Sequence, residues 1–195
     1  MNVRIVEPIR TNKKLIFVCT MLLISGGTIG FVTSLPAQPA DVDQSESRSP
    51  GPDRAETSTP NSIGLFVNNL TVTLILLLGA VSLSIPTVIG LLYNGYILGG
   101  LASTAFVQNE IGVFAVLVFT HGIVELPALI LAGAVSIRST VSIYKHLKGD
   151  RAEIMGPDEI RQVTTLVGMS VLLLAVAAII EGEVTVRLAE HLATR

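Results

Sequence analysis

One long apolar stretch, from Ile63 to Val107, contains no Asp, Glu, Lys or Arg. A helix needs about 20 apolar residues to cross a bilayer, so this stretch has room for roughly two crossings. Inside hydrocarbon, the backbone N–H and C=O groups must be paired within the segment, which limits such a stretch to helices. The sequence therefore predicts a helical hairpin embedded in a membrane.

The turn of this hairpin is predicted near residues 92–95. Asn94-Gly95 is a strong turn signal, and Pro86 disturbs the helix shortly before it. The limb that follows, about residues 96–107, is short and rich in glycine. This limb is therefore predicted to be either a tilted crossing or a re-entrant segment that does not span the bilayer.

Further apolar stretches cover residues 15–35, 111–137 and 162–180. Together with the hairpin they give about five crossings and predict an all-α, polytopic helical membrane bundle. The stretch 15–35 is longer than the apolar region of a cleaved signal peptide, which is usually about 7–15 residues, and no clean small-x-small cleavage site follows it. We therefore favour an uncleaved transmembrane anchor over a signal peptide.

The composition agrees with a membrane location. Hydrophobic residues make up 50% of the chain and charged residues 14%, whereas soluble domains carry roughly 25% charged residues. The net charge of -2 and the lack of a basic stripe with interleaved aromatic residues argue against a nucleic-acid partner. The single cysteine, Cys19, excludes a disulfide framework and a zinc site built on cysteines.

Charges outside the apolar stretches predict the orientation. Lys and Arg concentrate in residues 1–14 and in the loop 138–162, and these residue types favour the cytoplasmic side. Residues 36–62 combine more than half of the nine prolines with clustered Ser, Thr, Asp and Glu, a composition typical of disorder. We expect a multi-pass cell-membrane protein with a cytoplasmic N-terminus, a disordered outer loop at 36–62 and an outer C-terminal tail at 186–195.

Two ionisable residues interrupt the stretch 111–137. His121 and Glu125 are spaced i, i+4, which places them on one face of a helix. Counted from Glu110 at roughly 1.5 Å per residue, His121 lies about 16 Å deep, near the middle of a hydrocarbon core about 30 Å thick. A charge at that depth costs about 2.5–3.5 kcal/mol, so both side chains should face protein or water.

Pro127 lies directly beside this pair. Because proline has no N–H, we expect the carbonyl of Ile123 to lose its helical partner and the crossing to kink. Gly122 adds space on the same turn. A kink with a free acceptor suits either a hydrogen-bonded polar knot between helices or a binding site, and the sequence leaves both interpretations open.

Other polar residues also lie in or beside the apolar stretches. Capping or turn roles are predicted for Asn69 and Asn94. Glu181 follows the last apolar stretch, where it is either an interfacial charge or a partner of His121.

Small residues at GxxxG spacing occur at Gly26-Gly30 and Gly95-Gly99, and Ala128-Ala132 lies beside Gly133. This spacing lets helix backbones approach closely. We predict that these glycines lie in helix contacts within the chain, and they support a dimer only weakly.

The sequence carries no recognised catalytic motif. H-E-x-x-H, G-x-S-x-G and a Walker A loop are absent. His121 with Glu125 supplies two metal ligands, whereas a catalytic zinc usually takes three from the protein. We therefore expect no enzyme activity, no metal and no cofactor.

Several short motifs follow one another along the chain: FVNNL at 66–70, IP at 85–86, YNGYILGG at 93–100, THGIVELPALILAGA at 120–134 and IIEGEVT at 179–185. In this succession, and most specifically in the HGxxELxAxxxAG block, the chain resembles the stage II sporulation protein M family of multi-pass membrane proteins. The resemblance covers roughly residues 13–185 and implies a helical membrane domain at 63–185. Carried onto matching positions, it points to Asn69, Asn94, Gly95, His121, Gly122, Glu125, Pro127, Gly133 and Glu181.

The resemblance also implies a function. In sporulating bacteria, members of this family resemble the polytopic scaffold of a complex with cell-wall hydrolases. We therefore expect a non-catalytic scaffold or subunit that contacts the lipid bilayer and a membrane-protein partner or a second copy of itself. The alternative is a small transporter or permease subunit in which His121 and Glu125 bind a proton or a polar substrate.

Overall fold

The computed structural model describes residues 6–35, 62–109, 111–118 and 122–193. These residues form helices, with no strand among them, which confirms the predicted all-α class. The helices in chain order are α1 (Val6–Thr11), α2 (Lys13–Ser34), α3 (Ser62–Leu78), α4 (Ile85–Val107), α5 (Ile111–Leu117), α6 (Ile123–Leu147) and α7 (Pro157–Ala193). The outer loop expected at 36–62 lies almost wholly outside the described residues.

Four of these helices, α2, α4, α6 and the part of α7 from Pro157 to Ile180, are long and apolar enough to cross a membrane. Helix α3 has 17 residues, at the short end of the range of about 17–25 that a crossing needs. The fold is a helical membrane bundle, and the predicted count of about five crossings requires α3 to be one of them.

The turn of the first hairpin lies at residues 79–84, and the predicted turn at 92–95 is wrong. Pro86 sits in the first turn of α4, where its missing N–H has no helical partner to lose. Thr140 of α6 holds the actual turn, because its hydroxyl donates to Gly79 O at 3.0 Å and accepts from Ser84 Oγ at 2.8 Å. Residues 96–107 are therefore the second half of a full-length helix, and α3 is the short limb.

Asn94 and Gly95 lie in the middle of α4. The Asn94 side chain donates from Nδ2 to Gly90 O at 2.8 Å, which satisfies a polar donor within its own helix. Hydrogen bonding of this kind removes the main reason for an embedded asparagine to break a helix.

The later crossings also have different bounds from those predicted. The stretch 111–137 contains two α-helical segments, with α5 ending at Leu117 and α6 beginning at Ile123. Helix α6 then continues past Arg138 to Leu147, and α7 continues past Ile180 to Ala193. The 37 residues of α7 span about 56 Å, and fitting them into a 30 Å core would need a tilt near 60°, beyond the usual limit of about 40°. Part of α7 must therefore extend beyond the hydrocarbon.

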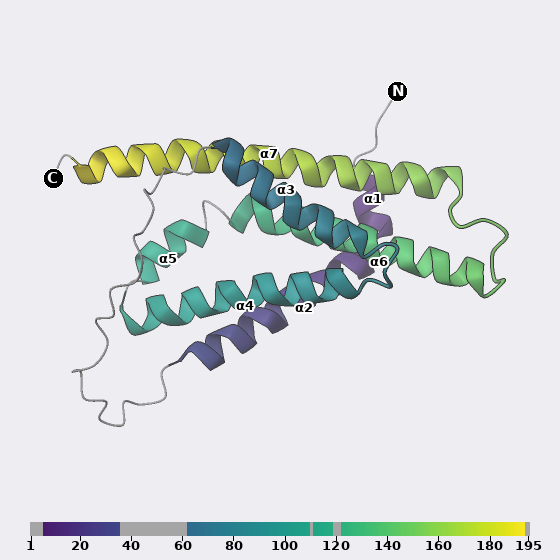
Figure 1. The fold of residues 1–195 in the computed structure, drawn as a ribbon, viewed down its shortest axis with the longest axis horizontal. Coiled ribbons are helices and arrows are strands. Elements are labelled where there is room, and N and C mark those ends of the chain that lie inside the picture. The colour runs from purple at the N-terminus through teal and green to yellow at the C-terminus, as the bar shows by residue number, and fades with distance from the viewer. Residues whose placement is uncertain (1–5, 36–61, 110, 119–121, 194–195) are drawn as a thin grey trace, which may run out of the picture.

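Helix α6 is the most enclosed of the long helices and contacts α2, α3, α4 and α7 (Figure 1). Small side chains occupy much of its buried surface, which lets four neighbours approach one helix. The core around it is formed by the buried residues Cys19, Leu23, Leu76, Leu91, Leu129, Ala132 and Ala134.

Helices α2 and α4 lie side by side and meet through glycines (Figure 1). A Cβ atom added at Gly26 would overlap the carbonyl of Leu92, and one added at Gly30 would overlap the carbonyl of Tyr96. Added Cβ atoms at Gly95 and Gly99 would overlap backbone atoms of α2 in the same way. The two GxxxG segments therefore pack against each other within one chain, at a backbone separation that only glycine allows.

A polar cluster around Arg138 joins α6 to α7 and to Asn12 between α1 and α2, beside the apolar contacts of the same helices. The Arg138 guanidinium donates to Asn12 Oδ1 at 2.7 Å and to Gln162 Oε1 at 2.8 Å, and lies 3.6 Å from Glu159. Asn12 is buried between α1 and α2 and also donates to Pro8 O at 2.8 Å. These partners explain why α6 continues through an arginine that was expected to end the crossing.

The glycine contact can be tested by matched substitutions. We expect Gly99→Leu to lower the free energy of unfolding by at least about 1–3 kcal/mol, because the new side chain must displace the α2 backbone. Gly168→Leu is the control, since an added Cβ at this helical glycine of α7 meets open space. Thermal unfolding of the purified chain in detergent measures both, and equal stability of the two variants would contradict the contact.

The Arg138 cluster gives a second prediction. Arg138→Met keeps much of the side-chain volume but leaves the buried Asn12 Oδ1 without its donor, so we expect a loss of about 1–3 kcal/mol. Arg161→Met, at an exposed position of α7, should change stability by less than about 0.5 kcal/mol. Chemical unfolding of both variants in the same detergent checks the difference, and a neutral Arg138→Met would refute the structural role.

Candidate functional site

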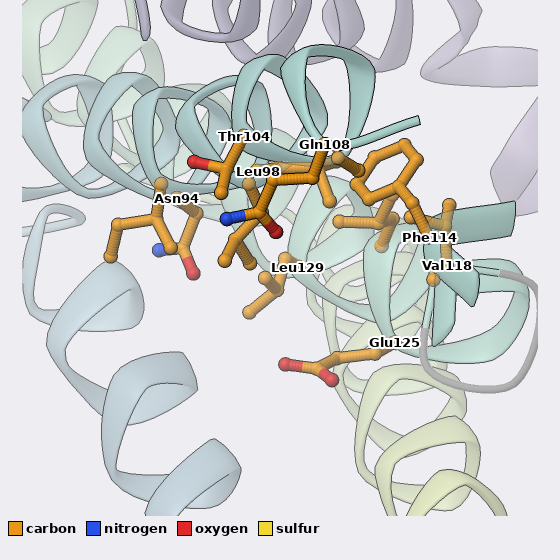
Figure 2. A pocket seen from close by; sticks show the side chains of 13 residues that line it. Asn94, Leu98, Thr104, Gln108, Phe114, Val118, Glu125 and Leu129 are labelled. Atoms are coloured by element: carbon orange, nitrogen blue, oxygen red, sulfur yellow. The ribbon is translucent and has the colours of Figure 1, made fainter. Parts of the chain in front are cut away.

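A cavity of about 330 Å³ lies between the second half of α4, helix α5 and the start of α6 (Figure 2). Its walls are mostly apolar, and its polar lining comes from Asn94, Thr104, Gln108 and Glu125. The apolar lining residues are Ile97, Leu98, Leu101, Ala105, Phe114, Val118, Leu126 and Leu129. Concave, largely apolar sites with a few polar groups are the usual form of ligand sites in proteins.

The pattern along α4 explains how this helix both packs and lines the cavity. Its buried stripe runs through Leu91, Gly95, Gly99 and Ser103, one residue per turn. The cavity-lining residues from Asn94 to Gln108 follow a neighbouring stripe at spacings of three and four residues. Because α2 fixes the glycine face, the adjacent face of α4 is held toward α5 and α6.

Glu125 carries the charge at this site. It lies in the first turn of α6, where the partial positive charge of the helix N-terminus favours a carboxylate. Figure 2 shows its side chain extending toward the cavity from α6, opposite the Gln108 and Asn94 side chains on α4. Glu125 is half-buried and already takes part in an interaction within the chain.

His121 lies outside the described residues, so its pairing with Glu125 stays a prediction. Glu181 lies within α7, and the structure describes the backbone of this residue only.

Pro127 falls in the second turn of α6, and Gly122 immediately precedes the helix. An added Cβ at Gly122 would come within 3.2 Å of Val118 and 3.4 Å of Leu126, the residues four positions away on either side. Pro127 thus lies inside α6 near its start, and the expected kink stays a prediction.

The structure corrects the roles expected for the two asparagines. Asn69 lies inside α3, is 9% exposed and takes part in an interaction, so it neither caps a helix nor forms a turn. Asn94 lies inside α4 and lines the cavity. Gly133, on α6, faces Leu91 and Cys19, where an added Cβ would come within 3.0 Å and 3.1 Å of their side chains. The predicted residues are thus divided between the cavity and the helix contacts.

Sequence reasoning missed Gln108, Thr104 and Phe114 as neighbours of Glu125. Gln108 follows the apolar stretch 63–107, and Phe114 falls in the same apolar stretch, 111–137, as Glu125. The spacing of Asn94, Leu98, Leu101, Ala105 and Gln108 on one helical face was the available signal. It could be recognised only once Asn94 was placed inside a helix.

The site offers hydrogen bonding and charge rather than a set of metal ligands. Among residues that the structure describes, no three His, Cys, Asp or Glu side chains are grouped to hold a metal ion. The polar lining supplies one carboxylate, two amides and a hydroxyl. Of these, the Thr104 hydroxyl donates to Gly100 O at 3.1 Å within α4.

Known proteins similar to this chain place it in a family. The model of the family "Stage II sporulation protein M" matches residues 16–186. Two relatives are uncharacterized proteins of Methanocaldococcus jannaschii. MJ0793 is 26% identical over 135 residues, covering 69% of this chain and 76% of the relative. MJ0706 is 31% identical over 135 residues, covering 66% of this chain and 57% of the relative. No solved structure matches the chain. Because the family model spans most of the sequence, including the α4 and α6 segments that form the cavity, the chain belongs to the stage II sporulation protein M family.

Proposed function

We propose that the chain is a non-catalytic subunit of a cell-membrane complex, in which it organises a protein partner. Its N-terminus and the 148–156 connection between α6 and α7 would face the cytoplasm, because Lys and Arg concentrate in residues 1–14 and in the segment 138–162 that contains this connection. The residues 36–62 would lie outside. This orientation would put the end of the α6–α7 hairpin in an aqueous compartment.

The observation that carries the proposal is the projecting end of this hairpin. Helices α6 and α7 extend together beyond the α3–α4 turn at the right of Figure 1. Exposed apolar side chains occur on this end: Leu147 is 79% exposed, Tyr144 58% and Ile154 45%. Apolar side chains grouped on a water-facing projection are typical of protein contact sites.

The hairpin end is also internally ordered by polar contacts. The Arg151 guanidinium binds both oxygens of Glu159, at 3.0 Å and 2.9 Å, and Glu159 accepts from Gly156 N at 3.3 Å. His146 Nδ1 lies 3.1 Å from Arg151 O. A connection held at both ends presents its exposed side chains in one arrangement, which lowers the entropy cost of binding a partner.

The partner proposal predicts the effect of removing the exposed apolar side chains. We expect Leu147→Ser combined with Ile154→Ser to leave insertion and stability unchanged, because both residues are exposed. The variant should lose at least about tenfold of the co-purifying partner, since apolar contacts at an interface centre dominate its affinity. Affinity purification from native membranes with quantitative mass spectrometry measures this loss.

Glu153→Gln in the same connection is the matched control, because Glu153 is exposed and polar. It should retain the partner of the original chain. Partner recovery that is equal in the double variant and the original chain would refute the hairpin as the contact site.

The cavity favours a second candidate function, a small transporter or permease subunit. A carboxylate beside an apolar cavity within a membrane bundle is a typical site for a proton or a polar substrate. Glu125 would bind the transported species, with His121 as its proposed neighbour.

This candidate predicts a transport defect without a folding defect. Glu125→Gln should reduce a pH-dependent flux in liposomes by at least about tenfold, because the neutral amide cannot take up a proton. Asp150→Asn, exposed between α6 and α7, should leave the flux unchanged. Absence of flux with the unaltered chain, together with retained partner binding, would exclude the transporter and leave the scaffold.

A further inference from the structure

We propose that the cavity between α4, α5 and α6 binds a small amphipathic molecule that carries a protonated primary or secondary amine. The ammonium group would contact Glu125, and the hydrocarbon part would fill the apolar remainder of the cavity. The inference goes beyond the scaffold role and does not depend on it. It shares Glu125 with the second candidate function, the transporter. If the chain is a transporter, the inference gives the chemical class of its substrate.

The size and lining of the cavity define the body of the ligand. Its volume of about 330 Å³ is within the range of about 300–1,000 Å³ found for small-molecule sites. Leu98, Leu101, Phe114 and Leu129 supply walls that offer no hydrogen bonds. A fully polar solute would lose its water there without replacement, whereas a hydrocarbon group gains from leaving water.

The charge at the cavity selects a cationic head group. Glu125 is the one charged residue among the lining residues that are described, and a carboxylate accepts hydrogen bonds but donates none. Its two oxygens offer about four acceptor positions, so its existing interaction within the chain leaves room for a ligand. An ammonium supplies donors and the opposite charge, while an anion would be repelled.

An amide on α4 can add a neutral acceptor to the head-group site. The Nδ2 group of Asn94 donates a hydrogen bond to Gly90 O. The Oδ1 atom of the same amide can accept a hydrogen bond from a ligand. Figure 2 shows the Asn94 and Gln108 amides on the α4 side of the cavity and the Glu125 carboxylate on the α6 side. Asn94 and Gln108 are 14 residues apart along α4, about 21 Å on the helix axis, so one ammonium can reach only one of these amides together with Glu125. One charged acceptor and one neutral acceptor match the several N–H donors of a protonated amine.

The amine could come from two sources with the same chemistry. One is a free amphipathic amine, and the other is the ammonium head group of an aminophospholipid. Both contain an N–H-bearing cation joined to an apolar part, which is what the site would recognise.

The test uses the full chain in detergent and labelled 2-phenylethylamine as the probe. 2-Phenylethanol is the control probe, because it has nearly the same shape but no positive charge. By equilibrium dialysis, we expect the amine to bind at least about tenfold more tightly than the alcohol, since hydrogen bonds to charged groups exceed neutral ones. Equal binding of both probes would overturn the proposal.

Two variants locate the binding. Glu125→Gln should remove the preference for the amine but keep binding of the alcohol, whereas Ala105→Phe should weaken both by filling the cavity. Glu153→Gln, exposed and distant in sequence from the cavity-lining residues, should change neither. An unchanged amine preference in Glu125→Gln, or unchanged binding in Ala105→Phe, would overturn the proposal. If Glu125→Gln does not fold, the two probes and Ala105→Phe still decide it.

Reconstitution distinguishes the sources. The chain is reconstituted in vesicles of phosphatidylethanolamine or of phosphatidylglycerol, and binding of labelled 2-phenylethylamine is measured in each. Weaker binding of this probe in phosphatidylethanolamine would show that the lipid head group competes for the site. Equal amine binding in both vesicles would identify a free amine. Loss of the amine site with partner recovery intact would refute this inference alone and leave the proposed scaffold standing.

Discussion

The contact between the backbones of α2 and α4 sets the geometry on which the remaining structure depends. Gly26, Gly30, Gly95 and Gly99 bring the two helices together where no Cβ could fit. In a bilayer, helices gain little from hiding apolar side chains from lipid, so close van der Waals contact must supply much of the attraction. The contact fixes the rotation of α4, and this rotation decides which residues of α4 turn toward α5 and α6.

A second level of order comes from α6. Its small buried residues let α2, α3, α4 and α7 share one helix as their centre. Polar contacts then fix its position along the axis: Thr140 binds the turn after α3, and Arg138 binds Asn12 and Gln162. Ser170 of α7 adds a bond to Ala128 O at 2.8 Å. Each interhelical hydrogen bond in a membrane contributes a modest free energy. Here these bonds fix α6 along its axis, a direction in which packing of small side chains alone would let the helix slide.

The sequence was sufficient for the fold class because apolar length and backbone pairing leave few alternatives in a bilayer. It was insufficient for several helix ends, and each error has a local cause. Asn94-Gly95 resembles a turn, yet Asn94 bonds within its own helix and Gly95 is needed for contact with α2. Arg138 resembles the end of a crossing, yet Asn12 and Gln162, distant in sequence, satisfy its guanidinium. Such compensation depends on tertiary contacts that spacing cannot reveal.

The candidate site shows the same division between local and tertiary information. Glu125 could be selected from the sequence, because an ionisable residue in an apolar stretch requires a physical reason. Gln108 and Phe114, which line the same cavity, could not, because they reach it only when α4 is continuous to Val107 and α5 lies against α4. The carboxylate lies in the first turn of α6, where the backbone dipole stabilises charge, and a cavity with apolar walls lies beside it. A carboxylate needed only to join helices would be better served by close packing, which excludes the space that this arrangement leaves open.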